Sequence, residues 1–183
     1  FTPGSHLTDG LAYEYAENRK LVTLTHNFEN DILAAAKSTA KRYLNSKSHT
    51  AALEKAALAI FDGMKKVHGL GARERLLLQI AVILHDCGKY ISMSRNADCS
   101  YHIIMATEII GLSHKEREII ANTVKYNPAD WESFEDISAR RLYGKKDYLL
   151  TAKLTAILRL ANALDRSHRQ KFKSVKASLR DSD

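Results

Sequence analysis

The sequence predicts an all-α domain. Only 8 glycines and 2 prolines occur among its 183 residues, so few positions interrupt a helix. Hydrophobic residues make up 45% of the chain and charged residues 27%, the balance of an ordinary globular protein. Over several long segments, apolar residues recur at steps of three and four, which is the period of an amphipathic helix.

The N-terminal third predicts three helices. Residues 1–25 read as a fragment, with a short helix that Thr8 and Asp9 would cap. A second helix is expected from Asn27 to Tyr43. A third helix follows, with a continuous apolar face at Leu53, Ala56, Ala57, Ile60, Phe61 and Met64. His49 lies four residues before Leu53 and therefore heads that face.

A central helix is expected over residues 73–91, because its residues are apolar nearly all round. His85 and Asp86 lie near its C-terminal end. Shorter helices are expected at 100–110 and 115–126, then a polar loop with one helical turn over 129–146.

A last helix is expected from Tyr148 to Asp165. Asn162 lies on its inward face, four residues after Leu158. Beyond Arg166 the apolar residues alternate with Lys and Ser, which favours a strand that the end of the chain cuts short. We therefore expect a bundle of about six to seven helices at 26–168, a remnant of another domain at 1–25, and a truncated strand or tail at 169–183.

Polar residues on these inward faces need an explanation. Neighbours on a helix diverge by about 100°, so His85 and Asp86 can share a partner only at a helix end or beside a crossing helix. A buried carboxylate without a hydrogen-bond partner or counter-ion lowers the stability of the folded state. His49 and Asn162 would reach the same point, and the four residues together suit one divalent ion such as Mg²⁺, Mn²⁺ or a Zn²⁺-like metal. The alternative is a hydrogen-bonded core pair without metal.

His49, the His85–Asp86 pair and the late Leu-Ala-x-Ala-Leu-Asp helix resemble the HD phosphohydrolase superfamily. The resemblance is closer to the HD-like C-terminal helical domain of the exopolyphosphatase and guanosine pentaphosphate phosphohydrolase (Ppx/GppA) family. It rests on short segments at 59–62, 68–70, 84–88, 100–101 and 158–168. Residues 5–11 look like the end of that family's preceding catalytic domain, so the resemblance spans almost the whole chain.

The chain departs from the complete pattern of that superfamily at the metal ligands. Asn162 stands where the last acidic ligand is expected, and histidines are missing before Ser100 and after Tyr126. Asp165, one turn further on, is a less favoured substitute for that acid. The resemblance therefore implies a degenerate metal site at His49, His85, Asp86 and Asn162, and an isolated domain that is incomplete as a catalyst.

Positive charge is concentrated near the C-terminus. The net charge is +7, and residues 140–180 hold twelve Lys/Arg and two acids. Clustered charge of one sign favours an anionic partner, although a solvated helix face is the plainer interpretation. The anion-binding residues that we predict are Arg140, Arg141, Lys145, Lys146, Arg166 and Arg169. The resemblance implies that the parent protein is a homodimeric hydrolase of phosphoanhydrides, and that this domain helps it bind polyphosphate or guanosine penta- or tetraphosphate.

Two other functions stay open. One is a self-standing, metal-dependent HD phosphohydrolase. The other is a nucleic-acid-binding module, which the low aromatic content of 8% and the lack of a legible helix-turn-helix disfavour. No segment reaches the length of about 18 apolar residues that a membrane span needs. Two cysteines are too few for a disulfide framework, so we expect a cytoplasmic protein.

Overall fold

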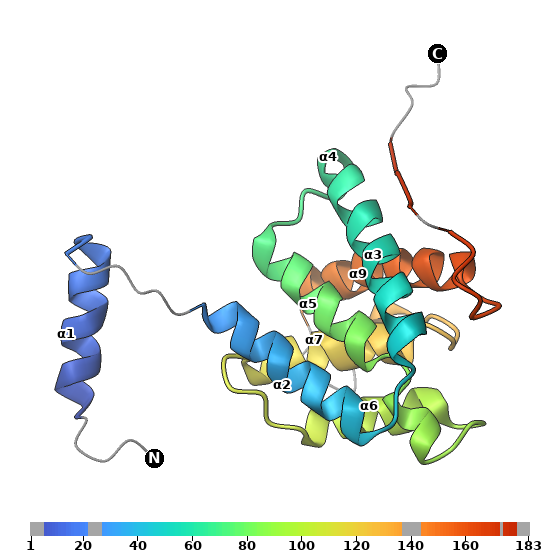
Figure 1. Ribbon diagram of the computed structural model, residues 1–183, viewed down its shortest axis with the longest axis horizontal. Coiled ribbons are helices and arrows are strands. Elements are labelled where there is room, and N and C mark those ends of the chain that lie inside the picture. Colours follow the sequence, from blue (N-terminus) through green and yellow to red (C-terminus); the bar gives the residue numbers. More distant parts are fainter. Residues whose placement is uncertain (1–5, 22–26, 137–143, 173, 179–183) are drawn as a thin grey trace.

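The computed structural model describes residues 6–21, 27–136, 144–172 and 174–178, and these residues are predominantly helical (Figure 1). A bundle is built from six long helices: α2 (Phe28–Arg42), α3 (Lys47–Gly63), α5 (Ala72–Leu84), α6 (Asn96–Ala106), α7 (His114–Lys125) and α9 (Lys145–Leu164). Two short elements join them, α4 (Lys65–His68) and the 3₁₀ helix η1 (Cys87–Tyr90). The all-α prediction is thus confirmed.

Helix α1 (Leu7–Asn18) stands apart from the bundle (Figure 1). Its side chains Leu11, Tyr13 and Tyr15 are exposed. The hydrogen bond from the His6 backbone amide to the Asp9 carboxylate helps to start this helix, at 2.8 Å.

Helix α5 is the centre of the bundle and contacts α2, α3, α7 and α9. Every residue from Leu76 to Leu84 except Gln79 is buried, because the helix is apolar on all sides. It ends at Leu84, earlier than predicted. His85 and Asp86 form a turn, and η1 then leads toward α6.

Gly88 allows α6 to pack closely on the chain that follows this turn. The Ser100 hydroxyl accepts a hydrogen bond from the Gly88 amide at 2.9 Å. A side chain at Gly88 would overlap the Asn96 carbonyl and the Ser100 amide, so the absence of Cβ lets α6 pack directly on η1.

Beyond α9, the described residues 166–172 and 174–178 form no strand, so that part of the expectation is not realised. The alternating pattern has another cause. Val175 and Ala177 are half-buried against the core, whereas Ser174, Lys176 and Ser178 are exposed. Alternate residues thus contact the bundle although the backbone is not paired in a sheet.

Two basic residues of α9 fix other helices. The Lys153 ammonium donates to the carbonyl of His68 at the end of α4, at 2.8 Å. The Arg159 guanidinium donates to the carbonyl of Tyr126, just after α7, at 2.9 Å. Carbonyls at a helix C-terminus lack intrahelical donors, so these cations satisfy them and tie both helices to α9.

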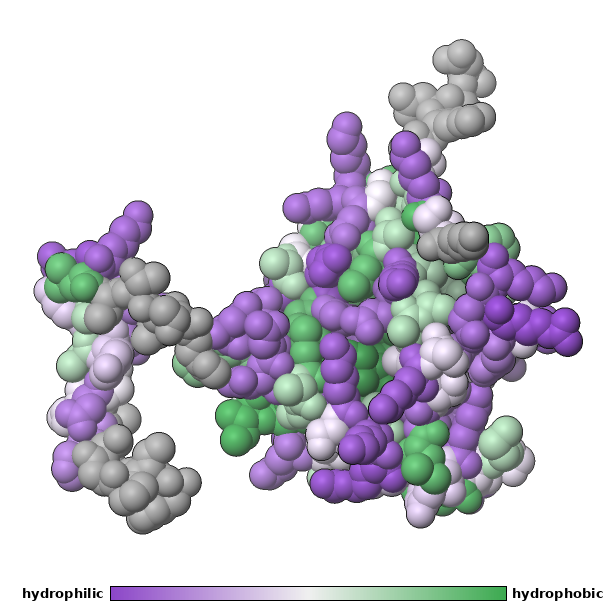
Figure 2. Space-filling model, viewed as in Figure 1, coloured by the Kyte–Doolittle hydropathy of each residue, from purple (hydrophilic) through white to green (hydrophobic). Residues whose placement is uncertain are grey.

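Hydrophilic side chains cover much of the visible face, with smaller hydrophobic areas among them (Figure 2). Within the described ranges, no helix combines the length and the apolar character needed to cross a bilayer.

Leu158 and Leu160 offer a matched pair for testing the core. Leu158 is 0% exposed and Leu160 is 52% exposed, on the same helix. We expect Leu158→Ala to lower the free energy of unfolding by about 2–5 kcal/mol, because it leaves a cavity. Leu160→Ala should change it by about 0.5 kcal/mol or less. Urea denaturation followed by circular dichroism measures both, and equal losses would contradict the packing described above.

Candidate metal centre

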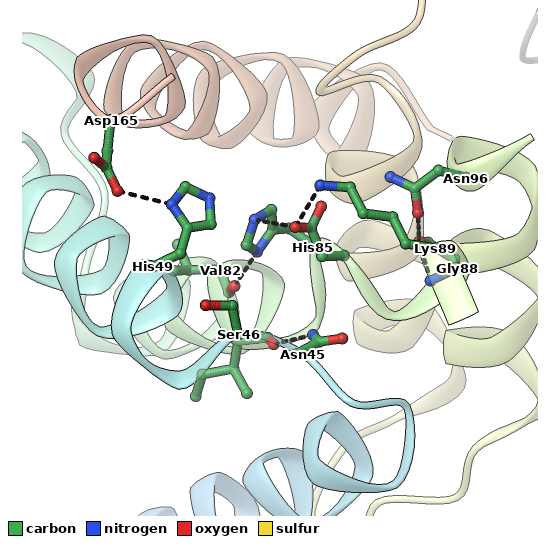
Figure 3. A network of polar contacts seen from close by, with 12 residues as sticks. Asn45, Ser46, His49, Val82, His85, Gly88, Lys89, Asn96 and Asp165 are labelled. Atoms are coloured by element: carbon green, nitrogen blue, oxygen red, sulfur yellow. Dashed lines mark hydrogen bonds and ion pairs between the residues drawn. The ribbon is translucent and has the colours of Figure 1, made fainter. Parts of the chain in front are cut away.

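His49, His85 and Asp86 converge at one end of α5, and Figure 3 shows the two histidine rings side by side. One donor atom from each of the three lies within 4.8 Å of the others. His49 comes from the first turn of α3, His85 follows the last residue of α5, and Asp86 precedes η1. These three residues are called the His–His–Asp centre below. The sequence prediction that they lie close together agrees with this geometry.

Asp165 orients the ring of His49. Its Oδ2 atom lies 2.8 Å from His49 Nδ1, in a contact that is almost fully buried. Burial would raise the pKa of the Asp165 carboxyl, but hydrogen bonds from His49 and Gln170 outweigh it and lower that pKa. The carboxylate can only accept, so His49 Nδ1 donates this hydrogen bond, and the neutral form of the ring then presents its lone pair at Nε2. That Nε2 atom is buried and has no hydrogen-bond partner among the described residues.

The ring of His85 is fixed in the same way by a backbone carbonyl. Its Nδ1 donates to the Val82 carbonyl at 2.7 Å, which leaves Nε2 unprotonated. Burial lowers the pKa of His85 to about 4, although the negative charge of Asp86 acts in the opposite direction. His85 is therefore neutral at pH 7, and its Nε2 is also buried without a hydrogen bond in the described structure.

Asp86 completes the cluster and already has a cationic partner. Its Oδ2 atom lies 3.4 Å from His85 Nε2 and 2.7 Å from the Lys89 ammonium. A pocket of about 390 Å³ opens beside this ion pair, and its lining includes Ser46, Tyr90 and His168.

The ring of His168 packs against the ring of His49. The two rings are stacked with their centroids 3.8 Å apart. His168 and Gln170 both have positive φ angles, 53° and 46°, which non-glycine residues rarely adopt. Hydrogen bonds from Gln170 to Asp165 and to the His168 carbonyl hold this turn. The sequence analysis did not select His168 as a site residue; its place in the 158–168 segment was the available signal.

Asn162 and Asp165 lie close together at the end of α9 and differ in their surroundings. Asn162 is half-buried on the last turn of α9, while Asp165 makes the contact with His49. Asp165 lies seven residues after Leu158, a rotation of only about 20° from the same inward direction, whereas Asn162 is rotated by about 40°. Helical spacing therefore points position 165 inward, but it does not fix the reach of the side chain, because residue 165 lies just beyond the end of α9.

The donor set fits a divalent transition metal. Histidine ligands of metals usually donate their second ring nitrogen to a carboxylate or a backbone carbonyl, and His49 and His85 show both forms. Two imidazole nitrogens and one carboxylate are ligands that Zn²⁺ and similar ions accept.

The four predicted anion-binding residues that the structure describes do not form one patch. Lys145 and Lys146 lie exposed in the first turn of α9, and Arg166 and Arg169 lie exposed beyond its C-terminus. The 20 residues of α9 separate the two pairs by about 30 Å. Arg140 and Arg141 fall outside the described residues.

Comparisons with known proteins bear on the whole domain. A search of curated proteins finds no match. Residues 33–183 match the family model described as Ppx/GppA phosphatase, domain III. This match covers most of the bundle and all the residues of the His–His–Asp centre, and the chain therefore belongs to the Ppx/GppA phosphatase family, as its domain III.

Proposed function

We propose that this domain is the anion-binding accessory domain of a phosphatase that hydrolyses phosphoanhydrides such as polyphosphate or guanosine penta- or tetraphosphate. Membership of the Ppx/GppA family supports the phosphatase part of this proposal. Contacts within a homodimer and a regulatory role belong to the same proposal, as does a cytoplasmic location.

The observation that carries the proposal is the distribution of basic side chains along α9. Lys153 and Arg159 are engaged with backbone carbonyls, but Lys145, Lys146, Arg166 and Arg169 are exposed. A single phosphate group cannot reach both ends of a helix about 30 Å long. A long polyanion can, and each phosphate that it places beside a cation releases counterions.

The His–His–Asp centre adds a degenerate HD-type metal site to this proposal. His49, His85 and Asp86 would hold one divalent ion, with Asn162 as the fourth candidate ligand. When bound in such a site, a metal can polarise a phosphoryl oxygen and lower the pKa of a water ligand. Asp165 and the Val82 carbonyl keep the two Nε2 lone pairs directed inward. An amide at position 162 supplies no negative charge, so we propose that the isolated domain is not a complete catalyst.

A self-standing phosphohydrolase is the second candidate. The observation in its favour is that His49, His85 and Asp86 lie close together with lone pairs available. It requires phosphatase activity in the isolated domain that Asp86→Ala abolishes. Gain of activity in Asn162→Asp would also favour it.

Polyphosphate binding can be tested by titration of the domain at low salt. We expect long-chain polyphosphate to bind, and the affinity to fall at least tenfold between 50 and 200 mM salt, as it does for polyanions that contact several cations. Replacing Lys145, Lys146, Arg166 and Arg169 by alanine should weaken binding and flatten the salt dependence. Isothermal titration calorimetry measures both quantities.

A matched control removes charge from another face. Lys37 and Lys41 are exposed on α2, so Lys37→Ala with Lys41→Ala should leave most of the affinity intact. If this control weakens binding as much as Lys145→Ala with Lys146→Ala, binding depends on net charge alone and the assigned residues are wrong.

Metal binding can be tested by elemental analysis after exposure to Zn²⁺ or Mn²⁺ and removal of free ion. We expect about one equivalent in the wild-type domain and much less in His85→Ala and in Asp86→Asn, because each loses a donor. His102 is an exposed histidine on α6, and His102→Ala should keep the metal. Equal metal content in all four proteins would refute the site.

The lowered pKa of His85 predicts how stability depends on pH in the metal-free domain. In the unfolded chain this histidine takes up a proton near pH 6.5, while in the folded domain it stays neutral until about pH 4. The free energy of unfolding should therefore fall as the pH is lowered from 6.5 to 4, by at most about 1.4 kcal/mol per pH unit from this group.

Urea denaturation in the presence of EDTA across that pH range checks the expectation. His85→Gln should reduce the slope, and His102→Ala should not. An unchanged slope in His85→Gln would show that His85 titrates normally in the folded domain.

A further inference from the structure

We infer that Lys89 is an internal counter-ion that competes with a divalent metal for Asp86 and so limits the metal affinity of the His–His–Asp centre. This inference rests on the metal site proposed above. It assigns to Lys89 a role that the sequence analysis did not consider.

The local backbone places Lys89 over Asp86. Asp86 is the residue before η1 and Lys89 is the third residue of η1, and in a 3₁₀ helix residues three apart in sequence lie above one another. The Lys89 amide donates to the Asp86 carbonyl at 3.0 Å, and its ammonium donates to Asp86 Oδ2 at 2.7 Å. The turn thus places the Lys89 backbone beside Asp86, and the charge of the carboxylate holds the ammonium there.

The Lys89 ammonium and the ring of His85 face the same carboxylate oxygen of Asp86. Asp86 Oδ2, which binds Lys89, is also the atom 3.4 Å from His85 Nε2 (Figure 3). A metal ion on that oxygen at about 2.1 Å would lie within about 5 Å of the ammonium. This separation is shorter than the screening length of about 8 Å at physiological salt, so solvent ions do little to reduce the repulsion.

Asp86 and Lys89 also differ in burial, which decides which of them moves. The Asp86 side chain is 14% exposed and that of Lys89 is 35% exposed. The carboxylate needs a cation to offset its desolvation, whereas the lysine has a flexible stem and lines a pocket of about 390 Å³ that it can enter. Binding of a metal therefore displaces Lys89 from Asp86, and the cost of that displacement reduces the apparent affinity.

The test is calorimetric titration of the metal-free domain with Zn²⁺ and with Mn²⁺, in the wild type and in Lys89→Met and Lys89→Gln. We expect both variants to bind at least tenfold more tightly than the wild type, and Lys89→Arg, which keeps the charge, to bind like the wild type. The metal should also raise the melting temperature of Lys89→Met by more than it raises that of the wild type.

Lys115→Met is the matched control. Lys115 forms a similar ion pair with Asp147, 2.9 Å long, and neither residue belongs to the His–His–Asp centre. The inference is supported if Lys89→Met or Lys89→Gln gains affinity and Lys115→Met does not, or if the wild type takes no metal and these variants do. If the wild type binds metal and neither Lys89→Met nor Lys89→Gln gains affinity, the role inferred for Lys89 is wrong while the proposed metal site stands. If wild type and variants all bind nothing, the proposed metal site fails with it.

Discussion

The buried hydrogen bond between His49 and Asp165 is the contact on which the centre depends. It joins the first turn of α3 to the residue that follows α9, across 116 positions of the sequence. It fixes the tautomer of His49 and also gives the Asp165 carboxylate, which is largely removed from solvent, a donor. Without it, the ring could rotate and the carboxylate would lose its main side-chain partner. One contact thus controls both the packing of two helices and the direction of a lone pair.

Helix α5 supplies the rigid support for that arrangement. Its apolar residues contact helices on several sides, so the position of its C-terminal end is determined by packing rather than by loop conformation. His85 and Asp86 stand at this end, where the chain changes from an α-helix to a turn. Polar side chains at the end of a buried helix can reach hydrogen-bond partners and ligands that are out of reach from the middle of that helix. This explains how an apolar element can deliver two ligand-type side chains.

The fold was predictable from periodicity because the strongest patterns belong to the helices with the largest buried faces. The approach of His49 to His85 followed from their places on two inward faces. The end of α5 was not predictable in this way, since the close packing of Gly88 against α6 is a tertiary contact that a hydrophobic period does not report. The apparent strand near Val175 shows the same limit: alternation reports which side chains touch the bundle, but it cannot report a missing hydrogen-bonding neighbour.

The helical spacing from Leu158 and the family resemblance both favoured Asn162 over Asp165. Both lie near the inward direction of α9, but residue 165 has left the helix, with φ −117° and ψ 33°. A helical projection describes side-chain directions only while the backbone stays helical, so the reach of Asp165 toward His49 required the three-dimensional structure. His168 also lies in a turn beyond the end of α9, where helical periodicity does not apply.

The contacts of Lys153 and Arg159 show that the positive charges of this domain do not all serve the same purpose. These two cations hold neighbouring helices to α9. Replacing them would therefore loosen the packing of the bundle first, and would weaken the positive electrostatic potential to a lesser extent. The isoelectric point of 9.4 counts them together with the freely solvated side chains. An acidic surface approaching this helix therefore meets two populations of positive charge, one anchored to the main chain and one able to turn toward it.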